Sequence, residues 1–126
     1  MKSTFLASLA LGLALLAASG CYRRQYREVV LHLPQLKSEA CALSVRDRLM
    51  ALNEKSQNRE LLFFQDVLVD ANAKTVTVIY NSSVTAGMNV LHLVASMGYD
   101  VADQADPKRA LPGDPAGRKT LPLACQ

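Results

Sequence analysis

The sequence predicts an α+β domain in which two helices cover one face of a four-stranded antiparallel sheet. Three observations predict this fold. Short segments rich in β-branched and aromatic residues show strand-like patterns. Two longer segments repeat apolar residues at helical spacing. The six segments follow one another in the order β-α-β-β-α-β within residues 27–103, a length that allows one small core.

The predicted domain begins with a strand and a helix. Glu28–Leu33 has apolar residues at alternate positions, which predicts a strand, and Pro34 ends it. Ser38 suits an N-cap, because its hydroxyl can accept a hydrogen bond from a backbone N–H of the first helical turn. A helix is therefore expected over Glu39–Leu52. Its apolar residues at helical spacing are Ala42, Val45, Leu49 and Leu52.

A β-hairpin is predicted after the polar connection at 53–60. Leu61–Asp70 is rich in Phe, Val and Leu, and Thr75–Tyr80 alternates in the manner of a strand. Residues 71–74 are short enough to form the turn between them. The two strands are therefore expected to pair.

A second helix and a last strand complete the predicted domain. The helix is expected over Val84–Met97, with Gly98 as a left-handed stop, and Tyr99–Ala102 forms the brief last strand. The helical side chains expected to face the core are Val84, Met88, Leu91 and Ala95.

The sheet face opposite the helices is expected to stay open. Strand parity places a mixture of apolar and polar residues there: Val30, His32, Leu68, Thr77 and Ile79. A face of this kind can dock a protein partner, although scattered apolar residues are also normal on surfaces. Both interpretations stay open at this point.

The first twenty residues predict export. Residues 1–20 combine the positive charge of Lys2, an apolar run at 4–17 and small residues before Cys21. This pattern resembles a bacterial lipoprotein signal, which implies that Cys21 is acylated, becomes the new N-terminus and binds a lipid bilayer. The absence of Asp after Cys21 resembles outer-membrane lipoproteins, which implies a cell-envelope location facing the periplasm. The alternatives are an ordinary secretory signal and an uncleaved anchor.

Two segments flank the predicted domain. Residues 21–26 are expected to form a basic membrane-proximal tether. Residues 104–126 are rich in Pro, Ala, Gly and charge, which predicts a flexible tail. The net charge of +3 has no basic stripe behind it, so nucleic-acid binding is not expected. The sequence contains no catalytic constellation, and we expect no enzyme.

The foldable part of the chain resembles the heavy-metal-associated domain family of soft-metal-binding modules. Pro34–Cys41 lies where the family has a Gly-Met-x-Cys-x-x-Cys loop, and Val45 and Leu49 match its apolar helix positions. Further matching segments are Val67–Asp70, Lys74–Tyr80 and Gly98–Val101. The resemblance implies a ferredoxin-like βαββαβ sandwich. Ser38 stands at the first cysteine position, so SxxC replaces CxxC and Cys41 alone matches a metal ligand.

Cys41 is the candidate metal ligand. A thiol at a helix start faces the positive end of the helix dipole, and the resemblance implies Cu(I) or another soft metal ion (Zn, Hg). One thiolate cannot form a closed site, so Cys125 or the Cys41 of a second chain is expected to supply the other. Outside the cytoplasm, Cys41 and Cys125 also tend to oxidise to a disulfide. Disulfide, metal chelation and an inert cysteine all stay open.

We expect the protein to be a membrane-anchored lipoprotein that binds a soft transition-metal ion, weakly or vestigially, through Cys41 and a second thiol. The alternative is a non-metal interaction or structural module with a Cys41–Cys125 disulfide. Ser38 is expected to act as a helix cap rather than as a ligand, because a neutral hydroxyl is a poor donor to soft metals.

Overall fold

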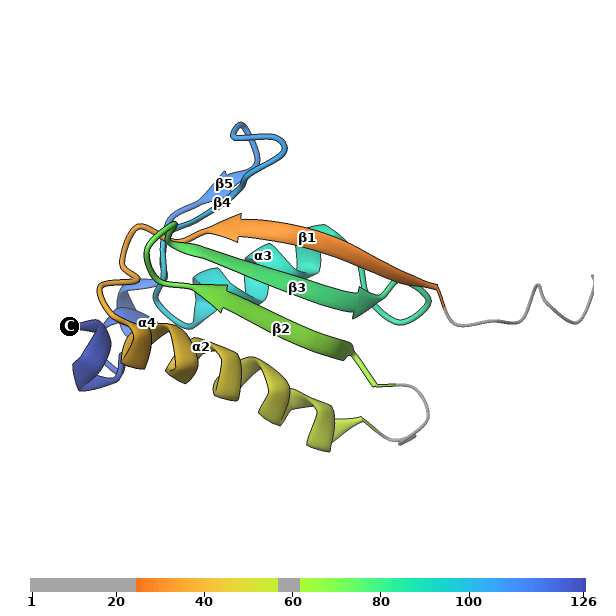
Figure 1. Ribbon diagram of the computed structural model, residues 1–126, viewed down its shortest axis with the longest axis horizontal. Helices are drawn as coiled ribbons and strands as arrows, with labels where there is room; N and C mark the ends of the chain where they lie inside the picture. Colours follow the sequence, from red (N-terminus) through yellow and green to blue (C-terminus); the bar gives the residue numbers. More distant parts are fainter. Residues whose placement is uncertain (1–24, 57–61) are drawn as a thin grey trace, which may run out of the picture.

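The computed structural model describes residues 25–56 and 62–126, which form an α+β domain with one five-stranded antiparallel sheet and two long helices (Figure 1). The strands are β1 (Tyr26–His32), β2 (Phe64–Asp70), β3 (Thr75–Asn81), β4 (Val101–Asp103) and β5 (Ala110–Leu111). The helices are α2 (Glu39–Ala51), α3 (Gly87–Ser96) and the single turn α4 (Pro115–Arg118). Two 3₁₀ turns are η2 (Leu52–Lys55) and η3 (Leu123–Cys125). The predicted signal and Cys21 lie outside the described residues.

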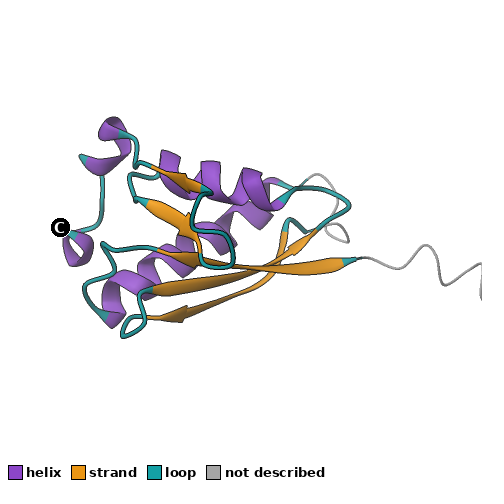
Figure 2. Ribbon diagram, turned by 90° about the horizontal axis from the view of Figure 1, so that it is seen from above, coloured by secondary structure: helices purple, strands orange, loops and turns teal. Residues whose placement is uncertain are grey.

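The sheet has the strand order β2-β3-β1-β4-β5, and each neighbouring pair is antiparallel. The two long helices lie on the same face of it (Figure 2). The predicted α+β class is confirmed, and the strands and long helices follow the predicted order as β1-α2-β2-β3-α3-β4. The predicted number of four strands is wrong, because β5 pairs with β4 through Val101 opposite Leu111 and Ala102 opposite Ala110.

The core follows from strand parity and helical spacing. Val29 and Leu31 of β1 lie opposite Val78 and Val76 of β3, and all four side chains are buried beneath the helices. The buried residues of α2 recur at helical spacing: Cys41, Ala42, Val45 and Leu49. Ser38 caps this helix as predicted, since its Oγ accepts a hydrogen bond of 3.2 Å from the backbone N–H of Cys41.

The start of α3 differs from the prediction. Val84 belongs to a turn in which its N–H donates to the carbonyl oxygen of Asn81, and the helix begins only at Gly87. Met88, predicted to face the core, therefore lies in the first helical turn and lines an open pocket beside Gln25. Gly98 has a φ of +106° and ends the helical segment as predicted.

The segment 104–126 differs from the predicted flexible tail. It contains β5, α4 and η3, and it buries Leu121 and Cys125 against the core. Its glycines permit close packing: a Cβ on Gly117 would lie 2.4 Å from the carbonyl oxygen of Ser96. In this segment the glycines allow two stretches of backbone to pack closely, and they do not make the chain flexible.

Strand β2 forms one edge of the sheet, and side chains from α2 and η2 satisfy part of that edge. Asn53 Nδ2 donates to the Phe64 carbonyl oxygen at 2.8 Å, while Asn53 Oδ1 accepts from the Phe64 N–H at 3.0 Å. Arg46 Nε donates to the Val67 carbonyl oxygen at 3.1 Å. These contacts occupy backbone groups that another strand would otherwise pair with.

Candidate functional site

The site that the sequence singles out is a disulfide. Cys41 and Cys125 are joined with a Cα–Cα distance of 5.0 Å, across a sequence separation of 84 residues. Cys41 is 0% exposed and Cys125 is 3% exposed. Of the three outcomes that the sequence left open for these cysteines, the structure contains the disulfide.

The loop before α2 fixes the position of Cys41. Leu33 and Leu36 are fully buried, and the Leu36 N–H donates to the Leu33 carbonyl oxygen at 3.1 Å. Gln35 Oε1 accepts from the backbone N–H of Asp100 at 3.0 Å, which ties the loop to the segment before β4. Cys41 then enters the first turn of α2 under the Ser38 cap and points into the core.

Backbone contacts of the C-terminal segment, residues 112–126, fix the position of Cys125. The Gly113 N–H donates to Asp100 Oδ1 at 2.8 Å, and the Asp114 N–H donates to the Ala95 carbonyl oxygen at 2.8 Å. Arg118 Nη2 forms an ion pair of 2.9 Å with the same carboxyl oxygen of Asp100. These contacts hold the segment against the end of α3. The segment ends in η3, which contains Cys125 and contacts α2 (Figure 1).

Tyr99 lies under the disulfide. Its side chain is fully buried, and its hydroxyl donates to Cys125 Sγ at 3.2 Å. Burial raises the pKa of this hydroxyl above its ordinary value, and the positive charge of Arg48 offsets part of the shift. Tyr99 is therefore a neutral hydrogen-bond donor to sulfur at neutral pH.

The donor set, as it is bonded here, does not fit a metal ion. The two cysteine sulfur atoms are bonded to each other, and the Ser38 hydroxyl caps the helix. His32 and His92 are exposed and lie on other elements. Within residues 25–56 and 62–126 no three His, Cys, Asp or Glu side chains gather into a potential metal site. A soft metal ion could use these thiols only after the disulfide is reduced.

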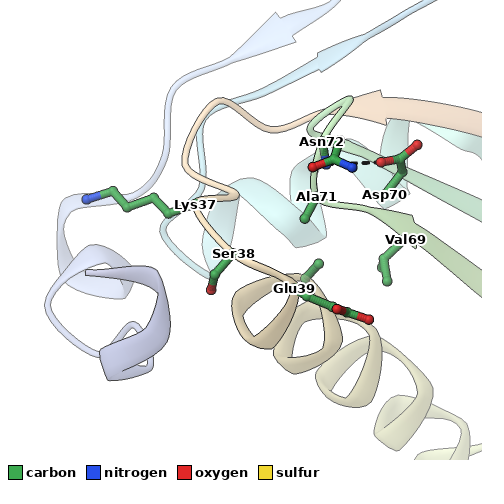
Figure 3. A pocket seen from close by; sticks show the side chains of 8 residues that line it. Lys37, Ser38, Glu39, Val69, Asp70, Ala71 and Asn72 are labelled. Atoms are coloured by element: carbon green, nitrogen blue, oxygen red, sulfur yellow. Dashed lines mark hydrogen bonds between the residues drawn. The ribbon is translucent and has the colours of Figure 1, made fainter.

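One cavity beside the loop is polar and contains no cysteine among its lining residues. Its volume is about 420 Å³, and it lies between the start of α2 and the turn after β2 (Figure 3). The lining side chains are Lys37, Ser38, Glu39, Ala42, Val69, Asp70, Ala71 and Asn72. Asp70 Oδ1 already accepts from the backbone N–H groups of Asn72 and Ala73. This cavity mixes both charges and offers no soft ligand.

The open sheet face has the composition that strand parity predicted. Leu68 is 53% exposed and His32 is exposed, whereas Val30, Thr77 and Ile79 are half-buried. The face therefore presents isolated apolar side chains among polar ones.

No helix among the described residues is both long and apolar enough to cross a bilayer.

Sequence reasoning missed the residues that support the disulfide. The sequence prediction includes Tyr99 in the last strand and in the family-like segment Gly98–Val101, and it assigns no supporting role to Asp100, Gly113 or Gly117. The spacing of Gly113 and Gly117 just before Cys125 was the available signal, because small residues permit close backbone packing. Composition alone pointed to flexibility instead.

No protein-family model matches the chain, and neither a curated protein nor a solved structure is significantly similar to it.

Proposed function

We propose that this protein is a lipid-anchored module of the cell envelope, with a structural or protein-binding role rather than an enzymatic one. The observation that carries the proposal is the buried disulfide between Cys41 and Cys125. Disulfides persist in oxidising compartments outside the cytoplasm, which agrees with the export signal predicted for residues 1–20. In this proposal the outer membrane holds acylated Cys21, and the domain faces the periplasm.

The anchor predicts where the protein fractionates. The wild-type chain is expected in the membrane fraction, because several acyl chains hold a protein on a bilayer stably. The Cys21→Ala variant is expected in the soluble envelope fraction, as measured by immunoblotting of separated fractions. Cys125→Ser serves as the matched control, since it removes a different cysteine and should stay with the membrane. Membrane retention of Cys21→Ala would contradict lipidation as the tether.

The domain is proposed to be a divergent ferredoxin-like fold of the heavy-metal-associated type. Support comes from the order β2-β3-β1-β4 within the sheet, from the two helices on one face and from the left-handed Gly98. The fifth strand and the disulfide-bonded C-terminal segment are additions to that fold.

A protein partner would use the open face of the sheet rather than its β2 edge. Arg46 and Asn53 already occupy the outward backbone groups of Phe64 and Val67. Leu68 of β2, by contrast, is exposed on the open face. The interaction role in this proposal therefore rests on side-chain contacts with the face and not on strand addition.

Soft-metal binding by the reduced protein is the second candidate. The disulfide shows that the fold brings both sulfur atoms together, and the Gln35 carbonyl oxygen lies 3.8 Å from Cys41 Sγ. After reduction, two thiolates at this position would suit a two-coordinate ion such as Cu(I) or Hg(II). Metal binding would then depend on the redox state of the compartment.

Titration with Cu(I) against a competing chelator tests the second candidate. The reduced mature chain is expected to take up one ion, and the oxidised chain and reduced Cys125→Ser are expected to take up none. Ser38→Cys restores the two-cysteine spacing and should allow uptake without Cys125. Equal uptake by reduced wild type and Cys125→Ser would rule out this ligand pair, and no uptake by the reduced wild type would end the metal proposal.

A further inference from the structure

The end of the domain at which the described chain begins exposes large apolar side chains. Figure 1 shows the start of β1 and the connection from β3 to α3 at one end, and the chain's C-terminus at the opposite end. Val84 and Met88 belong to the first end and are 40% and 37% exposed. The other strongly exposed large apolar side chains among the described residues are Leu43, Leu68 and Leu123. Two large apolar side chains, four positions apart in the sequence, are thus exposed at the end where the described chain begins.

Basic and apolar groups share a pocket at this end. The pocket has a volume of about 430 Å³, and Gln25, Arg27, Met88 and Arg109 are among its lining residues. No acidic side chain lines it. Asp106 Oδ2 lies 3.5 Å from Arg109 Nε and balances part of that charge, whereas no ion pair of Arg27 is found within the described residues. The pocket is therefore suited to an anionic group flanked by apolar matter.

Hydrogen bonds between Gln25 and Ser82 hold this pocket close to Cys21, the proposed anchor. The Gln25 carbonyl oxygen accepts from both the N–H and the Oγ of Ser82, each at 2.9 Å. Gln25 follows Cys21 by four positions in the sequence. Four residues span at most about 14 Å of extended chain. A headgroup layer is roughly 6 Å thick on each side of the hydrocarbon, so the pocket cannot move far from the lipid surface.

From this placement we infer that the surface formed by Gln25, Arg27, Val84, Met88 and Arg109 docks onto the bilayer that holds Cys21. The inference rests on the proposed lipid anchor and specifies the orientation of the domain. The two arginines contact lipid phosphates, and Val84 and Met88 enter the interfacial layer. The occupant of the pocket is an anionic phospholipid headgroup. The disulfide then lies at the end of the domain that is farthest from the membrane.

A single introduced tryptophan tests the orientation, because the chain contains no Trp. Met88→Trp is prepared in the acylated mature protein, extracted in detergent and reconstituted into vesicles of phosphatidylethanolamine and phosphatidylglycerol carrying brominated acyl chains. Its emission is expected to shift to shorter wavelength and to lose intensity through contact with bromine. Leu123→Trp, at the opposite end, and Leu68→Trp, on the open sheet face, are the matched controls and should keep the emission of a water-exposed indole.

The outcomes separate the orientation from the anchor. If the protein co-sediments with the vesicles but the emission is equal at positions 88, 68 and 123, the docking is overturned and the anchor stands. Quenching at 68 or 123 alone overturns it as well, because another surface then contacts the membrane. Failure of the acylated wild type to co-sediment overturns both proposals. Val84→Trp provides a second reporter in case Met88→Trp does not fold, and it is expected to respond in the same way.

Discussion

The Cys125→Ser variant is expected to lose about 3 to 4 kcal/mol of unfolding free energy, because the lost disulfide closes a long loop in the unfolded chain. The loop spans a sequence separation of 84 residues. Without the bond, η3 is held mainly by the burial of Leu121 and by local hydrogen bonds. Urea unfolding followed by circular dichroism measures the loss as a lower midpoint.

Chemical reduction supplies the control for this prediction. Dithiothreitol should lower the midpoint of the wild type to that of Cys125→Ser and leave the variant unchanged. A serine hydroxyl is close in size to a thiol, so the substitution creates little cavity of its own. A loss below about 1 kcal/mol would mean that the disulfide has no important role in stability.

The Gly117→Ala variant is expected to cost about 2 to 3 kcal/mol, as overpacking at a rigid contact does. A Cβ at this position would lie 2.4 Å from the Ser96 carbonyl oxygen and 2.7 Å from the Met97 carbonyl carbon. Both are backbone atoms at the end of α3, and they cannot turn aside as a side chain would. The C-terminal segment must move away from α3, and urea unfolding of the oxidised protein measures the cost.

Gly87→Ala is the matched glycine control. Its Cβ would lie 3.2 Å from the Tyr80 hydroxyl oxygen, which is the end of a side chain, and Ala favours a helix over Gly. We expect this variant to keep the wild-type stability.

The two destabilising changes are also expected to be non-additive, because both act on the attachment of the C-terminal segment. In the Cys125→Ser background, Gly117→Ala should cost much less than in the wild type. Full additivity would show that Gly117 and the disulfide support different parts of the fold.

Local patterns in the sequence predicted the part of the fold that depends on local chemistry. The alternation in β1 and β3 places Val29, Val76 and Val78 in the core, and the Ser38 hydroxyl caps α2 as its position suggested. Gly98 takes the left-handed conformation that its position after a helix indicated. These features are decided within a few residues of each other along the chain.

Features decided by distant contacts were harder to predict. Met88 shares helical spacing with Leu91, but Asn81, whose N–H donates to the Phe63 carbonyl oxygen, begins a turn that delays the helix start and leaves Met88 at the surface. The C-terminal segment has the composition of a linker, yet Asp100 and the backbone of α3 hold it in place. The disulfide was one of several outcomes for Cys41, because spacing alone cannot place two cysteines together.

The side-chain contacts along β2 bear on how neighbouring copies behave. With the proposed acylation of Cys21, the protein would diffuse in two dimensions, and copies would meet far more often than at the same amount in free solution. A sheet edge with all of its hydrogen-bonding groups unpaired would then capture a neighbour and begin ordered aggregation. Asn53 and Arg46 occupy three of those groups within the molecule itself. Crowding on the membrane surface is thereby compatible with a monomeric sheet.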